Sequence, residues 1–456
     1  MEMNNIHTVY FVGVGGIGMS ALARYFLTQD KAVWGYDKTP SALTNRLEEE
    51  GIKIWFDADL TEIEKLDKNS TLVVYTPAVK TGNAQLDYFE SNGFRMFKRS
   101  QVLGLISSAY KTLAVAGTHG KTTTSCLLAH VLNDSAVAIN AFLGGISRDF
   151  DSNLVLNDDA RYFVTEADEY DRSFLQLSPD IAIITSLDAD HLDIYGTPDE
   201  MIKNYQDFVR KIKPGGTLIT KLAFAPVLSF RDDIQVITYG LEGDEEYTAH
   251  QIEVKDAKYH FDVITPEGSY TDLSLGLPGR HNVDNAVSVI TIAHLLGVKE
   301  ESLKASLNSF RGVQRRFDVQ FNDGEKVYID DYAHHPSEIN ACVKSVRELF
   351  PNKKLTAIFQ PHLYSRTRDF ADEFAESLSQ VDELILLDIY PARELPIEGV
   401  TSRNLLKNIT IENKEVCLKE QLMDTLKNKE IEVLLTIGAG DIDRFVQPIK
   451  TWISNE

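Results

Sequence analysis

The sequence predicts an α/β protein with three domains, each built around a mainly parallel β-sheet. Short apolar segments alternate with helical segments along most of the 456 residues, which is typical of repeated βαβ units. A chain of this length is expected to hold about three domains, and its hydrophobic content of 43% supports a large core in each. Glycine-rich turns follow the apolar segments that end near residues 13 and 116, where doubly wound sheets bind phosphates.

The composition excludes several classes of partner. The net charge is −22, from 46 basic and 68 acidic residues, and no basic run stands out, which argues against nucleic acid and anionic membranes. Cys126, Cys342 and Cys417 are dispersed and fit neither a metal spacing nor a disulfide framework. The first residues lack the basic start of a signal peptide, and no apolar run reaches membrane-spanning length. We therefore expect a cytoplasmic protein, either a monomer or a weak homodimer.

The first domain, residues 1–108, starts with an apolar strand that runs into a glycine-rich turn and a helix. The turn has the three glycines of the dinucleotide-binding fingerprint, Gly13, Gly15 and Gly18. The acid of that fingerprint is Asp37, which follows the next strand. Gly16 lies within the same turn, and Ser20 lies in the helix that follows. Such a turn favours an anion at the helix start. The pattern predicts a nucleotide-like phosphate here, with an unliganded glycine turn as the alternative.

Further strands, over residues 32–36, 71–75 and 94–97, make this first domain Rossmann-like. Thr76 directly follows one of them, at the edge where α/β sheets place their ligand crevice. Arg99 and Ser100 precede the last helix of the domain, where they either reach an anion or cap and solvate that helix.

The central domain, residues 109–311, carries a phosphate-binding loop between a buried strand and an apolar-periodic helix. The loop and helix start consist of Gly117, Thr118, His119, Gly120, Lys121, Thr122 and Thr123. Val115 occupies the place of the first glycine of the full P-loop pattern, so the loop is a shortened variant. Its backbone amides and the Lys121 ammonium suit a polyphosphate, and a threonine hydroxyl suits Mg²⁺. The sequence therefore predicts binding of ATP or GTP.

Acidic clusters follow two further strands of the central domain. One contains Glu166 and Asp168, and the other contains Asp190 and His191. Carboxylates just past the strands of a P-loop sheet are expected Mg²⁺ ligands, because hard cations prefer oxygen. Loop acids that are merely solvated or cap the next helix are the alternative.

Two other features complete the central domain. Residues 246–276 alternate apolar and polar through glycine- and proline-marked turns, which predicts an antiparallel excursion. His281 and Asn285 then open a helix, where an asparagine amide either hydrogen-bonds a purine edge or caps the helix.

The third domain, residues 312–456, is again expected to be doubly wound. Paired arginines, Arg315 and Arg316, lie in the linker that precedes it. Polar residues follow two of its strands: Asp331, Tyr332 and His334; His362, Arg366 and Arg368. A third strand ends in Gly438, Gly440 and Asp441, a glycine-rich end that is more often a tight turn than a ligand contact. Arginines at a strand end can hold a carboxylate or phosphate through two parallel hydrogen bonds.

The order of these motifs is more specific than any one of them. It runs from GVGGIGMS through GTHGKTTT, TEADE, DADH and GRHNVDNA to QRRF, DDYAHHP and GAGD. In this order, over essentially the whole chain, the sequence resembles the Mur ligase family.

The resemblance implies an ATP- and Mg²⁺-dependent ligase that joins L-alanine to the carboxylate of UDP-N-acetylmuramate through an acyl phosphate. It implies that the first glycine loop holds the UDP-sugar diphosphate rather than NAD, through Gly15, Gly16, Gly18 and Ser20. Asp37 and Thr76 would lie near the uridine. The domains would close about hinges near residues 108 and 312.

The resemblance also assigns roles in the other two domains. Lys121 and Thr122 would bind ATP and Mg²⁺. Glu166 and His191 would bind the metal. Asn285 and His281 would lie beside the adenine of ATP. Asp331 would lie near the ATP ribose, and Arg315 near the ATP phosphates. The incoming amino acid would meet Tyr332, His334 and Arg366.

At one position the chain departs from the family. Where relatives often carry an arginine directly after the histidine that corresponds to His362, this chain has Leu363. The carboxylate clamp is then expected from Arg366 or Arg368.

Three alternatives stay open at this point. The nearest is a sister ligase that attaches a recycled tripeptide to the same UDP-sugar. An NAD-dependent oxidoreductase would leave the P-loop unexplained. A nucleotide-dependent switch would leave the polar strand ends of the third domain without a role.

Overall fold

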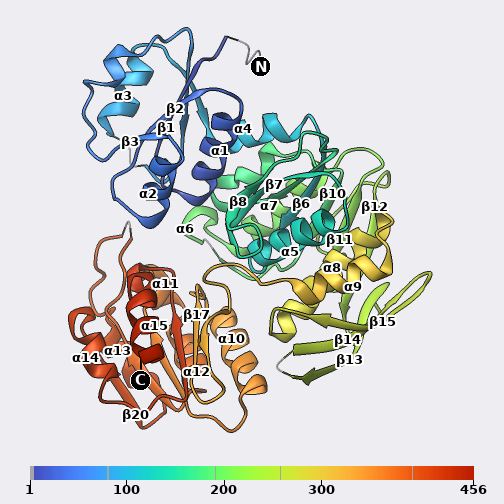
Figure 1. Cartoon of the computed structure of the whole chain (residues 1–456), viewed down its shortest axis with the longest axis vertical. Helices are drawn as coiled ribbons and strands as arrows, with labels where there is room; N and C mark the ends of the chain where they lie inside the picture. The colour runs from blue at the N-terminus through green and yellow to red at the C-terminus, as the bar shows by residue number, and fades with distance from the viewer. Residues whose placement is uncertain (1–4, 80–81, 191, 257, 393, 456) are drawn as a thin grey trace. The chain divides into compact units, whose positions relative to one another are not determined.

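The computed structural model describes residues 5–79, 82–190, 192–256, 258–392 and 394–455, and within these residues the chain forms three sheets with flanking helices (Figure 1). The predicted α/β fold class with three domains is confirmed. The predicted domain limits, 1–108, 109–311 and 312–456, remain a prediction.

The first sheet is parallel and has the strand order β3-β2-β1-β4-β5. Its strands are β1 (Thr8–Val12), β2 (Ala32–Tyr36), β3 (Lys53–Trp55), β4 (Thr71–Tyr75) and β5 (Arg95–Lys98). Its α-helices are α1 (Ile17–Thr28), α2 (Ala42–Glu49), α3 (Ala84–Ser91) and α4 (Arg99–Ser107). The chain order reverses between β1 and β4, so the glycine turn after β1 and Thr76 after β4 flank the crevice expected of such sheets.

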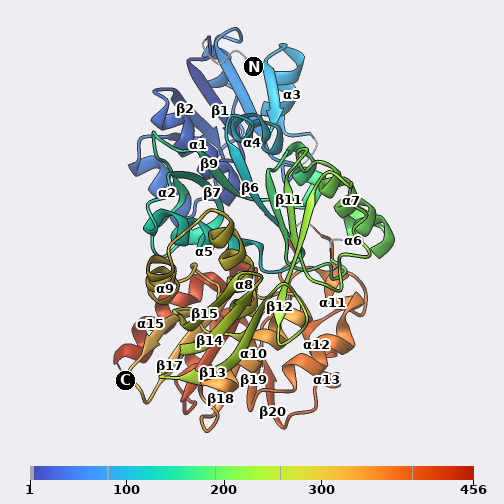
Figure 2. The same ribbon diagram turned by 90° about the vertical axis from the view of Figure 1, so that its right-hand side faces the viewer.

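The second sheet has ten strands in the order β15-β14-β13-β12-β11-β10-β6-β9-β7-β8. The strands are β6 (Lys111–Ala116), β7 (Ile139–Ser147), β8 (Ser152–Val155), β9 (Tyr162–Glu166), β10 (Ile181–Ile184), β11 (Thr217–Thr220), β12 (Gln235–Leu241), β13 (Tyr247–Lys255), β14 (Lys258–Thr265) and β15 (Gly268–Leu275). The helices are α5 (Lys121–Asp134), α6 (Leu192–Tyr195), α7 (Pro198–Arg210), α8 (Arg280–Leu295) and α9 (Glu300–Ser309). The excursion predicted over 246–276 is present as β13, β14 and β15, which lie side by side (Figure 2).

The third sheet has the order β16-β17-β21-β18-β19-β20, and within the described residues its edge pair β16–β17 is antiparallel while the other neighbouring strands are parallel. Its strands are β16 (Asp318–Asn322), β17 (Val327–Asp331), β18 (Leu355–Phe359), β19 (Glu383–Leu386), β20 (Asn413–Val416) and β21 (Val433–Ile437). Its α-helices are α10 (Pro336–Leu349), α11 (Tyr364–Asp369), α12 (Ala371–Leu378), α13 (Ser402–Asn408), α14 (Leu422–Leu426) and α15 (Val446–Asn455). Strands β17, β18 and β21 are buried throughout, as expected for a sheet covered on both faces.

The chain divides into two compact units. One comprises residues 1–250, 263–270 and 285–307, and the other comprises residues 251–262, 271–284 and 308–456. In the first unit one apolar core runs through both of its sheets, from Phe11 and Phe26 to Phe142 and Phe163. The predicted domain boundary at residue 108 therefore lies inside a unit with a continuous core.

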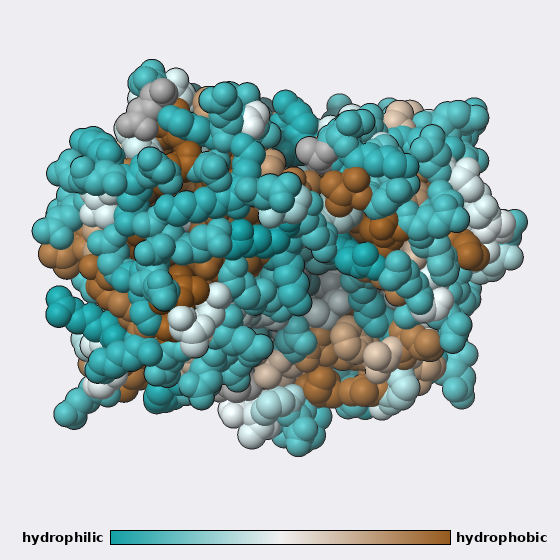
Figure 3. Space-filling view, turned by 90° about the horizontal axis from the view of Figure 1, so that it is seen from below, coloured by the Kyte–Doolittle hydropathy of each residue, from teal (hydrophilic) through white to brown (hydrophobic). Residues whose placement is uncertain are grey.

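The face shown in Figure 3 is mostly hydrophilic, with apolar side chains in small groups. Among the described residues, no helix is long and apolar enough to cross a membrane.

Candidate active site

The phosphate loop of the central domain is held open by glycines and by the end of a neighbouring strand. Gly117 has φ +128°, and a Cβ there would lie 2.8 Å from the Ser186 amide nitrogen. Gly120 has φ +80° and caps the N-terminus of α5. The His119 amide donates to Ser186 Oγ at 2.7 Å, and Thr185 Oγ1 donates to the His119 carbonyl. Loop amides at a helix start are thus fixed in a shape that suits a polyphosphate.

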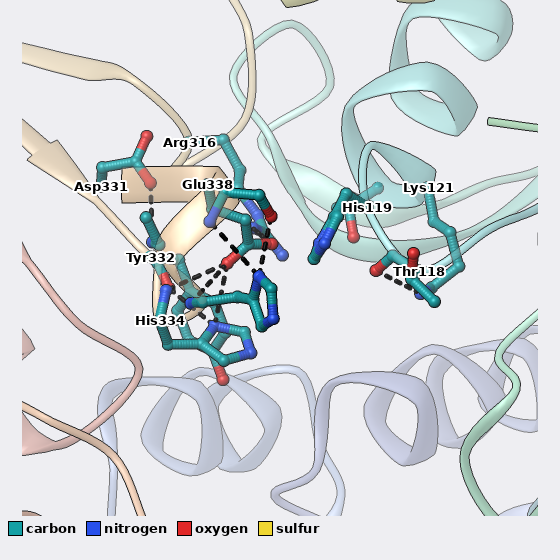
Figure 4. A network of polar contacts seen from close by, with 12 residues as sticks. Thr118, His119, Lys121, Arg316, Asp331, Tyr332, His334 and Glu338 are labelled. Atoms are coloured by element: carbon teal, nitrogen blue, oxygen red, sulfur yellow. Dashed lines mark hydrogen bonds and ion pairs between the residues drawn. The ribbon is translucent and has the colours of Figure 1, made fainter. Parts of the chain in front are cut away.

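Lys121 is turned back onto this loop. Its Nζ donates to the Gly117 carbonyl at 2.6 Å and to the Thr118 carbonyl at 3.2 Å. Lys121 and Thr118 are labelled in Figure 4. Lys121 also pairs with both oxygens of Glu169, at 3.0 and 2.8 Å, and the Glu169 side chain is 1% exposed. Burial alone would lower the Lys121 pKa, but the carboxylate of Glu169 and its acidic neighbours raise it. Lys121 is therefore a fully charged ammonium at the phosphate loop.

An oxygen-rich pair lies beside Lys121. Thr122 Oγ1 donates to Glu166 Oε2 at 2.7 Å. A Cβ on Gly144 of β7 would lie only 2.5 Å from Glu166 Cδ, so the glycine leaves the space that this carboxylate occupies. A hydroxyl and a carboxylate oxygen side by side are suitable Mg²⁺ ligands, with phosphate and water completing the shell.

The second acidic cluster is only partly described. His191, a predicted metal ligand and catalytic residue, lies outside the described residues. Asp190 is 5% exposed. His119 Nε2 lies 3.3 Å from Asp188 Oδ2 of the same loop. Among the described residues, no group of three or more His, Cys, Asp or Glu residues has the arrangement needed to hold a metal ion.

The helix predicted to face the adenine contains both candidates. Asn285 and His281 lie in α8. The Asn285 side chain approaches the phosphate loop, since a Cβ on Gly120 would lie 2.8 Å from Asn285 Oδ1. The adenine assignment of both residues remains a prediction.

The glycine loop of the first domain starts α1. Gly13 has φ +92°, and Gly16 is the N-cap of the helix, with no side-chain hydrogen bond to the helix amides. The Gly15 amide donates to Asp37 Oδ2 at 2.8 Å, so the predicted uridine-side acid binds the loop itself. Ser20 is fully buried, and its hydroxyl donates to the Ile17 carbonyl at 2.8 Å.

One cavity of about 240 Å³ joins this glycine loop to the acidic edge of the central sheet. Its lining includes Gly16, Gly18, Thr76, Arg99, Gly144, Glu166 and Asp168. Among the described lining residues, Arg99 is the only cation. Its Nη2 lies 3.1 Å from Asp168 Oδ2, and its Nη1 would lie 2.6 Å from a Cβ on Gly18. A cation and helix-start amides thus occupy one part of the cavity, and the Glu166 carboxylate occupies another.

In the third domain Arg315 is held against the end of the sheet. Its φ is +63°, and its guanidinium donates to the Gly438 carbonyl at 2.6 Å and to Asp330 Oδ2 at 3.3 Å. It also lies 5.0 Å from the centre of the Tyr332 ring. These contacts fix Arg315 beside Tyr332, while its predicted role at the ATP phosphates remains a prediction.

Asp331 is a buried acid with two backbone donors. Its carboxylate accepts from the amides of Phe317 and Ala333, both at 2.7 Å. Burial raises the pKa of this carboxyl to about 6, against the opposing effect of Arg316. Its predicted position near the ATP ribose remains a prediction.

The Asp331 pKa predicts a defined pH dependence of stability. An acid whose pKa rises on folding stabilises the protein below its unfolded pKa and loses that contribution as pH rises through the folded value. Two pKa units correspond to about 3 kcal/mol. We expect the free energy of unfolding of the wild type, minus that of Asp331→Asn, to fall by about 2 kcal/mol between pH 4 and pH 7. Urea denaturation at both pH values measures this difference, and a constant difference would contradict the assignment.

The predicted amino-acid residues lie close together in the third domain. His334 Nδ1 lies 3.0 Å from the Tyr332 carbonyl and 3.4 Å from Glu338 Oε2, a pair drawn in Figure 4. The His334 and His362 rings are 6.1 Å apart. Arg366 Nη1 lies 3.4 Å from His362 Nδ1, and Arg366 is 7% exposed. The structure therefore brings Tyr332, His334 and Arg366 into one cluster with His362 at its centre.

Leu363 and Arg368 belong to the segment that follows strand β18. Leu363 is 5% exposed and has φ +70° at the start of α11. Arg368 Nε donates to Asp369 Oδ1 at 2.7 Å, and its side chain is 54% exposed. The buried Arg366 is thus better placed than Arg368 for a desolvated clamp.

Sequence reasoning missed three residues of this site. Glu169 pairs with Lys121, Gly144 leaves space for Glu166, and Asn153 bonds to the first turn of α1. The acid-rich run around Glu169 was visible in the sequence, but its choice of partner was not. No local signal marks Gly144 or Asn153.

Three α/β sheets, with a P-loop in the second and a glycine loop in the first, define a class of multidomain nucleotide-binding proteins. Family models cover nearly the whole chain: the Mur ligase family catalytic domain over residues 8–111, the Mur ligase middle domain over 115–293, and the Mur ligase glutamate ligase domain over 315–440. The chain belongs to the Mur ligase family.

Individual relatives are similar over their full length. A UDP-N-acetylmuramate–L-alanine ligase from Phocaeicola vulgatus is 48% identical over 98% of both chains. One from Parabacteroides distasonis is 49% identical over 99% of this chain and 98% of its own. The crystal structure of UDP-N-acetylmuramate–alanine ligase from Thermotoga maritima has a TM-score of 0.83 at 28% identity, over 98% of this chain and 100% of that one. A murein peptide ligase from Psychrobacter arcticus, at 24% identity with a TM-score of 0.74 over 99% of each chain, shares the fold.

Proposed function

We propose that this chain joins L-alanine to the carboxylate of UDP-N-acetylmuramate, with cleavage of ATP, in the synthesis of peptidoglycan precursors. Relatives at 48% and 49% identity carry the name of this activity. The observation that carries the proposal is the single cavity shared by the first glycine loop and Glu166. The diphosphate of the UDP-sugar would meet the loop amides and Arg99 at one end, and its carboxylate would approach the Mg²⁺ that Thr122 and Glu166 would hold at the other.

The reaction needs ATP because a carboxylate does not accept an amine directly. Its leaving group would be oxide, so the carboxylate is first phosphorylated to an acyl phosphate. The amine of L-alanine then attacks the carbonyl carbon, and phosphate leaves through a tetrahedral intermediate. Both steps gather negative charge on oxygen, which preorganised cations and amides stabilise.

The residues of the central domain supply that stabilisation. Lys121 is charged and lies at the phosphate loop, where it would meet the terminal phosphates of ATP. Thr122 and Glu166 are the oxygen donors that would hold Mg²⁺, which would neutralise charge on the transferred phosphoryl group. The first glycine loop and Arg99 would hold the UDP-sugar diphosphate.

The third domain would bind the amino acid. Arg366 would hold the L-alanine carboxylate through its planar fork, with Tyr332 and His334 beside it. The expectation of a cytoplasmic monomer or weak homodimer stays a prediction.

The direct test of the proposal is phosphate release with UDP-N-acetylmuramate and a panel of amines. L-Alanine should stimulate release from ATP far more than the tripeptide of the sister ligase. Stimulation mainly by the tripeptide would assign the chain to the sister activity. Tight NADH binding without phosphate release would point to an oxidoreductase.

Gly16→Val tests the diphosphate site. A Cβ on Gly16 meets its nearest atom, the Gly13 carbonyl oxygen, at 3.6 Å, and Gly16 lines the cavity, so the side chain fits the fold and enters the ligand space. We expect the KM for the UDP-sugar to rise about tenfold or more, with little change in the KM for ATP. Steady-state kinetics with each substrate varied in turn measures both constants. Equal rises would contradict the assignment.

Arg366→Lys tests the carboxylate clamp. Lysine keeps the charge but loses the two-donor fork, so the KM for L-alanine should rise about tenfold to a hundredfold. The KM values for ATP and the UDP-sugar should change little, and acyl-phosphate formation, followed by isotope exchange, should persist. Arg368→Lys is the matched control, because Arg368 is exposed and paired with Asp369, and it should behave as the wild type. A larger effect at Arg368 would move the clamp there.

A further inference from the structure

The first turn of α1, which carries the glycine loop, is bonded to a side chain of the central sheet. Asn153, in edge strand β8, is fully buried. Its Nδ2 donates to the Ile17 carbonyl at 2.6 Å and to Ser20 Oγ at 3.0 Å. Both acceptors belong to the first four residues of α1, so one amide spans the start of this helix.

The orientation of this amide is determined by a third bond. Arg24 Nη1 donates to Asn153 Oδ1 at 2.5 Å. A guanidinium only donates, so Oδ1 must face Arg24 and Nδ2 must face Ile17 and Ser20. Arg24 is in turn fixed by Glu50, with Nε and Nη2 on the two carboxylate oxygens at 2.7 and 2.8 Å. Every polar atom of the Asn153 side chain is thus used.

Apolar packing accompanies these hydrogen bonds. The Tyr25 ring of α1 lies 5.6 Å from the Phe142 ring of β7, and one core runs through both sheets. Helix α1 therefore has two separate restraints against the central domain. One is apolar and broad, and the other is a specific set of hydrogen bonds to its first turn.

We propose that Asn153 is a positioning residue for the UDP-sugar: it fixes the first turn of α1, and thereby the glycine-loop amides, against the edge of the central sheet that holds Glu166. This inference rests on the proposed function. Gly16, Ile17 and Gly18 line the same cavity as Glu166, so a shift of the first turn changes where the diphosphate binds relative to the reacting carboxylate. Without the hydrogen bonds from Asn153, the glycine loop would bind the diphosphate in a poorly defined position.

Asn153→Asp is the sharpest test. The carboxylate keeps an acceptor for Arg24 but places an oxygen, instead of a donor, against the Ile17 carbonyl. We expect the KM for the UDP-sugar to rise about tenfold to a hundredfold, the cost of disrupting buried hydrogen bonds, with the KM for ATP changed less than about twofold. Calorimetric titration of the UDP-sugar without ATP should show the same loss of affinity.

Asp151→Asn is the matched control. Asp151 makes an exposed ion pair with Arg46 across the same pair of domains, at 3.1 Å, with side chains 72% and 40% exposed. Its φ of +47° suits asparagine, and loss of an exposed pair has little effect. This variant should bind and turn over the UDP-sugar as the wild type does.

The outcomes separate the two proposals. A wild type that neither binds nor consumes UDP-N-acetylmuramate would overturn the proposed function. A wild type that does both, with Asn153→Asp unchanged or with both KM values raised equally, would overturn the role of Asn153. If Asn153→Asp does not fold, the variant Arg24→Lys tests the same role. A lysine ammonium can pair with Glu50, but it lacks the second guanidinium nitrogen that donates to Asn153 Oδ1. Arg24→Lys should raise only the UDP-sugar KM, by about threefold, and equal changes in both constants would contradict the inference.

Discussion

Replacing Lys121 with alanine is expected to lower turnover about a thousandfold while UDP-sugar binding stays near normal. The thousandfold loss is the usual scale for removing one preorganised charge from a phosphoryl-transfer site. The UDP-sugar should bind because the glycine loop and Arg99 lie in the other domain. Single-turnover kinetics and calorimetric titration of the UDP-sugar measure the two quantities.

The structure adds a second consequence of the same change. Lys121 is an ion-pair partner of Glu169, which is buried, so Lys121→Ala removes a cation that balances a buried carboxylate, at a cost of about 3–5 kcal/mol in folding free energy. The double variant Lys121→Ala/Glu169→Gln removes that charge. It should recover most of the stability and none of the turnover. Recovery of turnover in the double variant would show that Lys121 acts through folding and not through ATP.

Gly144→Ala is expected to lower turnover about a hundredfold or more. A Cβ at residue 144 would overlap the Glu166 carboxylate, so this group must leave its position beside Thr122. The Mg²⁺ concentration needed for half-maximal activity should rise, and UDP-sugar affinity should also fall because Gly144 lines the cavity. A titration of activity with Mg²⁺ measures the first effect.

A second substitution tests the cause of that loss. Aspartate at position 166 is one methylene shorter, so Gly144→Ala/Glu166→Asp should recover about tenfold of the lost activity if overlap with the carboxylate is responsible. Thermal denaturation of both variants controls for folding. A double variant that is no better than Gly144→Ala would show that the alanine acts elsewhere, for example on the backbone of β7.

Much of the fold could be predicted because the signals were local. Strands β2 and β4 were predicted at their observed bounds, Ala32–Tyr36 and Thr71–Tyr75, since each is a mainly apolar run that ends before a polar turn residue. Strand β7 was missed because Gly144 and Gly145 interrupt its apolar pattern. Its edge partner β8 is short and half polar, so it gave no periodic signal.

The site was predictable only where residues act with their sequence neighbours. The phosphate loop is one continuous segment, and its geometry follows the pattern of its glycines. Asn153 and Ile17 are 136 residues apart, and Lys121 and Glu169 are 48 residues apart, so their pairing depends on how the sheets assemble. After the departure at Leu363, Arg366 was the main candidate for the clamp and Arg368 the alternative, and the burial of Arg366 favours the same choice.

The central claim is that ATP activates the muramyl carboxylate before L-alanine attacks, and the fate of the carboxylate oxygens tests it most directly. UDP-N-acetylmuramate labelled with ¹⁸O in the lactyl carboxylate is incubated with the enzyme, ATP, Mg²⁺ and L-alanine. Mass spectrometry of the released phosphate should find one ¹⁸O atom per molecule, because the bridging oxygen of the acyl phosphate leaves with phosphorus. Amide product formed together with unlabelled phosphate would contradict the account.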